Sequence, residues 1–232
     1  MKHLLLFIFQ LLLLCHQVPA QSRKSIRIKA GEDIAQAYSP DGFYRFPKFS
    51  KAVLFYKGGN QNAGQLVNYN ILSGTMQFIN PAGKTFNITD PSKIDSVVFE
   101  KNTFIYSDGF MENIIQTNLT LLLKKITIKT RVEKIGALGL PNQSSSIDNI
   151  SIYSAETDAY HLVINSDIVV TENVYWYWID KSNTLLKATK GNFLKLIPAE
   201  RQGSAETYIK QHKINFDNED DLKDVTLNLA VQ

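Results

Sequence analysis

Side chains that could hold a metal are few in this chain and are not spaced for it. The 232 residues include four histidines and one cysteine, and no His-x-x-x-His pair occurs. Zinc centres need three or four nitrogen, sulfur or carboxylate ligands held together. We therefore expect no metal or other cofactor, and we interpret His161 and His212 as packed or surface residues. A site that combines one of them with distant carboxylates is the alternative.

The sequence contains no complete phosphate-binding motif and no complete nucleophile motif. The glycines of 59–64 have the spacing of a P-loop, but Gln65 and Leu66 follow where that motif needs Lys and Ser or Thr. We interpret this stretch as a flexible hairpin loop. No Gly-x-Ser-x-Gly elbow occurs, and Ser73, between Leu and Gly, is typical of a turn between two strands.

Acidic residues allow two further interpretations. Asp217, Glu219 and Asp221 imitate the first three ligands of an EF-hand loop, but Leu222 stands where that loop needs Gly. Helix capping explains these acids. Two carboxylates that face each other across a cleft could also hydrolyse a glycosidic bond. The acids that lie near the ends of expected strands are Asp95, Asp108, Glu112 and Asp167.

The densest aromatic feature is the run of Tyr175, Trp176, Tyr177 and Trp178. On a strand, the two tyrosines share one face and the two tryptophans share the other, because successive side chains alternate. If one pair packs in the core, the other forms an exposed platform that could stack on sugar rings or on a protein partner. This run is the candidate binding site. The alternative is that sheet partners and C-terminal helices cover both faces.

A basic stretch at 124–134 also alternates. Ile126 and Ile128 fall on one face of a strand, and Lys125, Thr127 and Lys129 fall on the other. This pattern is typical of a strand with one buried and one solvated face. Attraction of the basic face to anionic glycans or lipid headgroups is the alternative.

The first 20 residues have the three parts of a secretory signal peptide: a basic start, an apolar stretch at 4–14, and Val-Pro-Ala at 18–20. The apolar stretch is shorter than the about 20 residues that a spanning helix needs. We expect cleavage after Ala20 and export to the periplasm, the outer membrane or the medium. An uncleaved anchor and a lipid-modified Cys15 are the alternatives.

Composition excludes several classes of protein. The chain has 25 basic and 22 acidic side chains, and such a balance argues against a dedicated nucleic-acid binder. No segment after the signal is apolar enough to span a membrane. Cleavage removes the one cysteine, so the exported chain has to be stabilised by its core without disulfides.

The spacing of β-rich runs predicts the fold of the first half. Short runs closed by Gly, Pro, Asn or Asp recur about every ten residues, which is typical of an antiparallel meander. The expected strands are 52–56, 65–70, 75–79, 85–88, 96–99, 103–106, 110–115 and 119–132. A preceding run at 25–29 is a further short strand. We divide the chain into a signal peptide (1–20), an N-terminal antiparallel β module (21–132), a loop or linker (133–149) and a C-terminal region (150–232).

The C-terminal region changes character along its length. We expect strands at 150–153, 160–164, 168–171, 174–179 and 184–188, and then two or three short helices. One helix at 192–197 is stopped by Pro198, and Ser204 and Asp217 are the expected N-caps of the others. The predicted fold class is α+β, mostly β: antiparallel meander sheets with a small C-terminal helical appendix.

Two stretches resemble a group of secreted proteins common in Bacteroidetes for which no activity is established. The first, at 49–78, contains AVLFYKGG, LVNYN and GTMQF; the second, at 186–222, contains LKATK, FLKL, YIK and INF. The resemblance implies a Gram-negative envelope or extracellular setting and carries over no functional residues.

These features favour a non-catalytic exported envelope protein that binds a protein partner or a polymer such as a glycan. The export signal, the hairpin architecture and the incomplete catalytic motifs support this hypothesis. The alternatives are an exported carboxylate-dependent hydrolase acting on glycans, and a structural subunit of an envelope complex.

Overall fold

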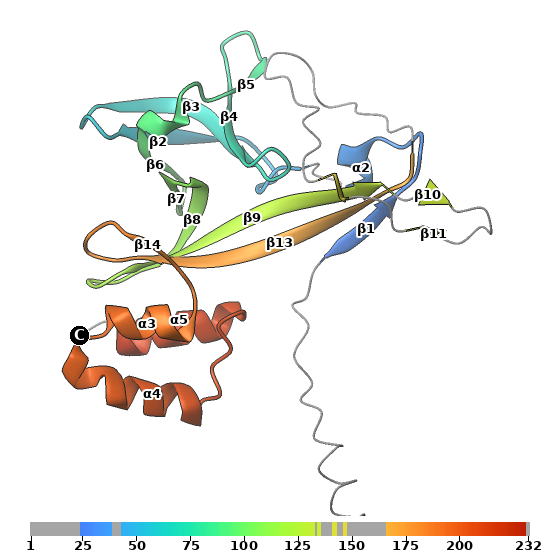
Figure 1. The fold of residues 1–232 in the computed structure, drawn as a ribbon. Coiled ribbons are helices and arrows are strands. Elements are labelled where there is room, and N and C mark those ends of the chain that lie inside the picture. The colour runs from blue at the N-terminus through green and yellow to red at the C-terminus, as the bar shows by residue number, and fades with distance from the viewer. Residues whose placement is uncertain are drawn as a thin grey trace, which may run out of the picture.

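The computed structural model describes residues 24–38, 43–132, 134–135, 141–142, 146–147 and 166–230. Antiparallel sheet is the main secondary structure of this part of the chain, and three helices lie together at its C-terminal end, which confirms the predicted fold class (Figure 1). Several predictions fall outside the described residues: the signal peptide, His161, the strands at 150–153 and 160–164, and most of the linker at 133–149.

One sheet joins the N-terminal module to the strands that follow the predicted linker. Its order is β1 (Ser25–Ile28), β13 (Ile168–Ile179), β9 (Leu121–Val132), β8 (Gly109–Gln116), β7 (Asn102–Ser107), β6 (Ile94–Phe99), β2 (Ser50–Tyr56), β3 (Gln61–Asn70), β4 (Thr75–Ile79) and β5 (Thr85–Asn87). In addition, β12 (Ser146–Ile147) pairs with β9 and β14 (Leu185–Lys187) pairs with β13. A separate pair contains β10 (Lys134–Ile135) and β11 (Pro141–Asn142).

The hairpin loop expected at 59–64 is shorter than predicted. β3 already begins at Gln61, and its pairing with β2 shifts by one residue around Gly64. Gly64 has φ of 89°, a conformation that suits glycine at a β-bulge. The glycine spacing that imitates a P-loop therefore marks a turn and a bulge.

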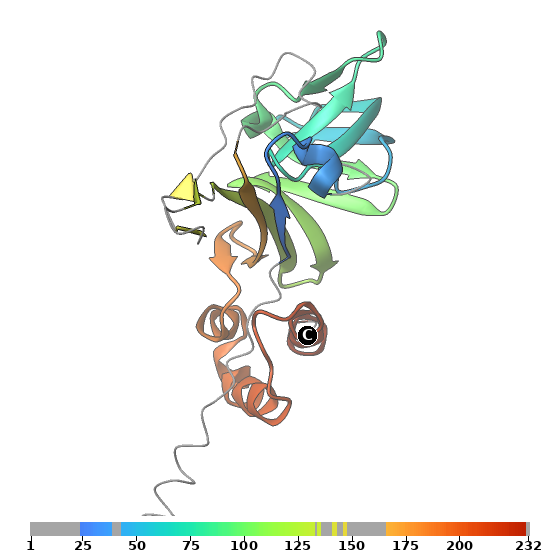
Figure 2. The same ribbon diagram turned by 90° about the vertical axis from the view of Figure 1, so that its right-hand side faces the viewer.

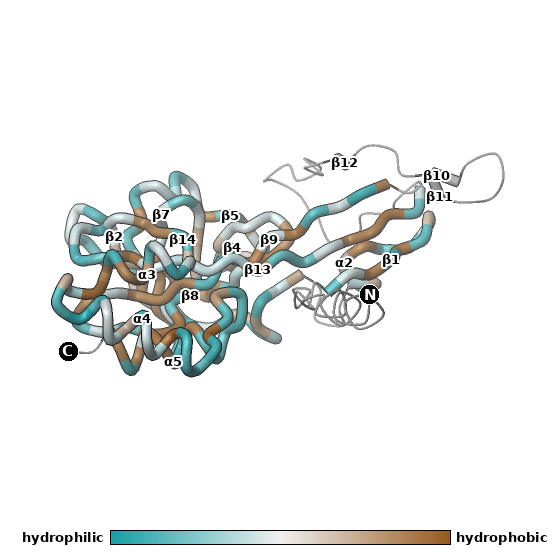
Figure 3. Tube along the Cα trace, turned by 60° about the horizontal axis from the view of Figure 1, so that its bottom comes forward, coloured by the Kyte–Doolittle hydropathy of each residue, from teal (hydrophilic) through white to brown (hydrophobic). Residues whose placement is uncertain are grey.

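The longest pairing in the sheet joins β9 and β13, which lie side by side across the molecule (Figure 1). The register runs without a shift from Ile168 opposite Val132 to Ile179 opposite Leu121. The two strands predicted at 168–171 and 174–179 are thus one strand. Apolar and polar residues alternate in the middle of β9, from Lys125 to Lys129, and Figure 3 shows the hydropathy along both strands. We call the face with the even-numbered residues of β9 and β13 the inner face, and the opposite one the outer face.

Three hydrophobic clusters lie in succession on the inner face. At one end Leu122, Trp176 and Trp178 pack against the C-terminal helices. In the middle Ile126 joins a core that β2, β3, β4, β6, β7 and β8 close by curling over it. At the far end Ile168 and Val170 pack with β1 and with α2 (Ile34–Tyr38), a short helix that the sequence did not indicate. Figures 1 and 2 show the curled strands and the helices at separate places along this long ladder.

The helical appendix contains α3 (Lys190–Leu196), α4 (Gln202–Gln211) and α5 (Glu219–Leu229), with a short 3-10 turn at Ala199–Arg201; a second 3-10 turn, at Pro91–Lys93, lies between β5 and β6. The predicted stop at Pro198 is correct, but both predicted N-caps are wrong. Ser204 lies inside α4, where its hydroxyl donates to the Arg201 carbonyl. α5 is capped by Asn218, whose side chain accepts from the backbone N–H groups of residues 220 and 221.

We predict that the helical appendix is part of the cooperative fold. Phe193 of α3 is fully buried, and its ring lies 5.0 Å from that of Trp178. Phe193→Ala should lower the free energy of unfolding by about 3–5 kcal/mol because a buried aromatic side chain is lost, as measured by urea denaturation. Leu227→Ala, at a 50% exposed apolar residue of α5, is the control and should change it by less than about 0.5 kcal/mol. Equal effects of the two substitutions would contradict the prediction.

Candidate functional site

The predicted aromatic platform is only half accessible. Trp176 and Trp178 lie on the inner face and are buried under the helices, and the Trp178 indole N–H donates to the Thr226 hydroxyl over 3.1 Å. Tyr175 and Tyr177 lie on the outer face and are half-buried. Burial, followed by the charge of Asp108 and the neighbouring Tyr175, raises the pKa of Tyr177. The indoles therefore serve the core. On the outer face Tyr177 packs against the cluster of Met111, Leu123 and Ile179, which leaves Tyr175 for stacking.

The other sequence candidates have structural roles in the described part of the chain. The His212 ring stacks on Tyr208 at 4.0 Å between centroids. Ser73 lies in the β3–β4 turn, as predicted, and shares a hydrogen bond with Thr75. Asp167 accepts from the Ala30 N–H, and Asp221 of the apparent EF-hand accepts from the Asn215 N–H. Among the described residues, no group of three or more potential metal ligands occurs, and no helix is long and apolar enough to span a membrane.

Ion pairs fill the seam between the middle cluster and the helical cluster. The Arg45 guanidinium donates twice to the buried Glu112 carboxylate, at 3.0 and 3.3 Å. Lys124, opposite Glu112 in the ladder, lies 5.3 Å from the centre of the Trp176 ring and donates to Glu219 of α5 over 2.9 Å. In each pair the two opposite charges compensate each other, and the pair of Lys124 with Glu219 attaches α5 to the sheet.

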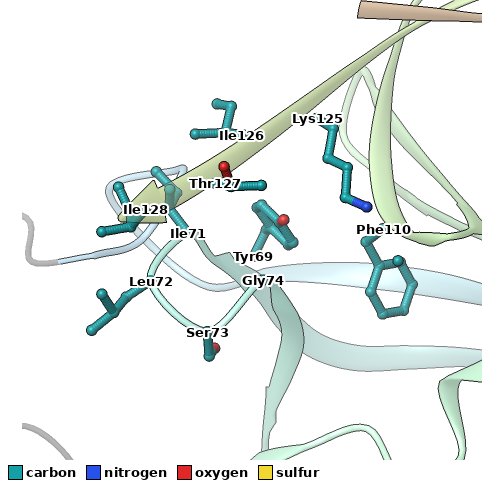
Figure 4. Close-up of a pocket in the computed structure, with 11 residues that line it drawn as sticks. Tyr69, Ile71, Leu72, Ser73, Gly74, Phe110, Lys125, Ile126, Thr127 and Ile128 are labelled. Atoms are coloured by element: carbon teal, nitrogen blue, oxygen red, sulfur yellow. The ribbon is translucent and has the colours of Figure 1, made fainter. Parts of the chain in front are cut away.

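The seam between the middle cluster and the α2 cluster contains a pocket instead. This cavity of about 260 Å³ is lined by Tyr69, the turn at 71–74, Phe110 with the adjoining Gly109, and residues 125–128 of β9. Figure 4 shows these side chains around the space. We call it the edge pocket. It lies where β8 and β9 separate, because β8 pairs with β9 only up to Glu112 opposite Lys124, and its first three residues pair with β7 alone.

Part of the β9 backbone faces this pocket with N–H and C=O groups that no neighbouring described strand pairs. The Ala188 N–H donates to the Trp176 carbonyl and the Glu172 N–H donates to the Lys24 carbonyl, so the even residues of β13 direct their backbone groups away from β9. Residues opposite each other in an antiparallel pair either bond to each other or both turn away. Lys124, opposite Trp176, therefore directs its N–H and C=O toward β8.

By the same alternation, Ile126 and Ile128 direct their backbone groups toward the edge pocket. On this edge β9 pairs with β8 up to Lys124 and with β12 at Thr130 and Arg131. No strand among the described residues pairs with 125–129 between them. The pocket therefore offers main-chain donors and acceptors next to apolar side chains.

Two polar side chains add to this lining. The Tyr69 phenol can donate a hydrogen bond, and burial, followed by the charge of Glu112, raises its pKa to about 12. The Lys125 ammonium donates to the carbonyl and to the carboxylate of Asp108. The arrangement suits binding of a chain with amide groups, and it includes no nucleophile paired with a base.

Sequence reasoning did not identify this pocket. Its residues come from three separate segments, of which only Ser73 and the alternating β9 stretch were singled out. One available signal was that the expected strand at 119–132 is much longer than the expected strands beside it, so part of it would lack a partner. No family model, curated protein or solved structure matches the chain.

We predict that the ion pairs of Glu219 stabilise the protein at neutral pH and that this contribution is lost in acid. Burial alone would raise the pKa of this carboxyl, but hydrogen bonds from Lys223 and Lys124 outweigh burial and lower it. A lowered pKa in the folded state stabilises the protein above the unfolded pKa, and this contribution is lost as the pH falls through the folded pKa. In thermal melts from pH 7 to pH 3, Glu219→Gln should therefore lose less stability than the unmodified protein.

Glu206→Gln is the matched control, because Glu206 is an exposed residue of α4 whose pair with Lys190 spans 3.9 Å. It should lose as much stability in acid as the unmodified protein. If Glu219→Gln and Glu206→Gln show the same pH dependence, the pairs of Glu219 do not contribute.

Proposed function

We propose that this protein is a non-catalytic binding protein that captures an extended segment of a partner protein at the edge of β9. The observation that carries the proposal is the stretch at 125–129, where Ile126 and Ile128 direct backbone N–H and C=O groups into the edge pocket. An extended peptide that adds to a sheet edge gains its affinity from such main-chain hydrogen bonds and its specificity from pockets for alternate side chains.

The predicted signal peptide supports a role outside the cytoplasm, at the envelope or beyond it. Loops and edges on a rigid β scaffold are common sites of binding. The ladder between β9 and β13 supplies such a scaffold, because it holds the edge fixed between two clusters of the core.

A carboxylate hydrolase has less support. Of the acids near strand ends, Glu112 forms an ion pair with Arg45, and Asp108 forms one with Lys125.

Strand addition predicts which peptide amides matter. Seven-residue peptides selected from a random display library against the exported chain (residues 21–232) should bind in extended form, and their affinity is measured by fluorescence polarisation. An added strand bonds through every second residue. Methylating the amides of one alternate set should weaken binding at least about tenfold, since about two hydrogen bonds are lost, and methylating the other set should not.

A substitution in the protein locates the site. Leu72→Arg places a long charged side chain at the edge pocket and should abolish binding of the same peptides, whereas Leu227→Arg, on the exposed face of α5, should not. Thermal melts establish that both variants fold. The proposal is wrong if no peptide is selected, or if selected peptides are insensitive to both methylation sets and to Leu72→Arg.

A further inference from the structure

The outer face of β9 beside the edge pocket is basic. Lys125 and Lys129 alternate with Thr127, and Lys129 is exposed. Their partners across the ladder in β13 are Tyr175, Thr171 and Asn173, so no carboxylate stands opposite these positions. Asp108 does bind Lys125, but its side chain is 87% exposed, so solvent weakens that pair.

The inner face at the same edge is apolar. Ile126 and Ile128 lie there with Ile71 and Phe110, and the Tyr69 phenol is also in the lining. Glu172, opposite Ile128 in the ladder, accepts a hydrogen bond from the Tyr38 hydroxyl. Charged groups are unfavourable in such a lining unless they are paired. A space of about 260 Å³ admits side chains of moderate size.

A strand added to β9 has to match both faces at once. Its side chains alternate between the two faces of the sheet, in step with those of the neighbouring strand. Residues opposite Ile126 and Ile128 therefore enter the edge pocket, and residues opposite Thr127 and Lys129 lie among the lysines of the outer face. Opposite charges on neighbouring strands attract and like charges repel.

Resting on the proposed function, we infer that the captured segment alternates apolar and acidic residues, with the apolar side chains in the edge pocket and the acidic ones beside Lys125 and Lys129. The partner is thus a protein with an acidic, amphipathic β-segment. A peptide with lysines at the outward positions is disfavoured by the same charges.

Three synthetic hexapeptides test this inference. They alternate valine with glutamate, glutamine or lysine, and their affinities for the exported chain are measured by isothermal titration calorimetry at low and high salt. The glutamate peptide should bind about three- to tenfold more tightly than the glutamine peptide, and the lysine peptide most weakly. The difference should shrink at high salt because screening weakens exposed charge pairs.

A charge reversal in the protein provides the second test. Lys129→Glu should reduce the preference for glutamate over lysine by at least about threefold. Lys51→Glu, at an exposed position of β2, is the matched control and should leave the preference unchanged. Both substitutions are on exposed side chains, so neither removes a core contact.

The outcomes separate this inference from the proposed function. Equal binding of the three peptides, with sensitivity to alternate amide methylation, would overturn the acidic preference and leave strand addition standing. If none of the three binds and the random library also yields no binder, the proposed function itself is wrong. A preference that persists unchanged in Lys129→Glu would show that the charges of β9 do not cause it.

Discussion

The pairing of β9 with β13 is the interaction on which the rest of the structure depends. Both strands have twelve residues, and they pair along their whole length in one register. Because side chains alternate along a strand, this register turns Ile126, Trp176 and Trp178 to the inner face, while Leu123 and Ile179 pack with Met111 in a smaller cluster on the outer face. A slip of one residue would exchange the two sets. The curled strands, the C-terminal helices and α2 all pack on the inner face.

The open edge follows from the separation of two neighbouring strands. β8 begins at Gly109 but pairs with β9 only from Glu112 onward, so β9 continues beyond Lys124 without β8 beside it. Proteins usually cover or charge such an edge, since unpaired main-chain groups recruit other chains. Here lysines occupy the outer side of the gap and the turn at 71–74 bounds its inner side. The gap is short, which favours selective capture of a small segment over open-ended association.

Much of the sheet was predictable, because strands and turns leave local signals. The alternation from Lys125 to Lys129 predicted the two faces of β9 correctly. The side of the sheet that each aromatic residue takes was not predictable, since Trp176 and Trp178 are buried by helices distant in sequence. The cap of α4 was misplaced because this helix continues from the 3-10 turn at Ala199–Arg201 and has no side-chain cap. The cap of α5 was misplaced by one residue because Asp217 and Asn218 are both residues that can cap. The edge pocket depends on strand pairing across the chain, which no local pattern reports.

The most direct measurement is residue-resolved hydrogen exchange of the backbone amides of β9 in the free, exported chain. Lys125 and Thr127 direct their N–H groups toward β13, and Ile126 and Ile128 direct theirs toward the edge pocket. If the edge is open, the amides of Ile126 and Ile128 exchange much faster than those of Lys125 and Thr127. Equal, strong protection of all four amides would show that the edge is already paired and would contradict the proposed capture site.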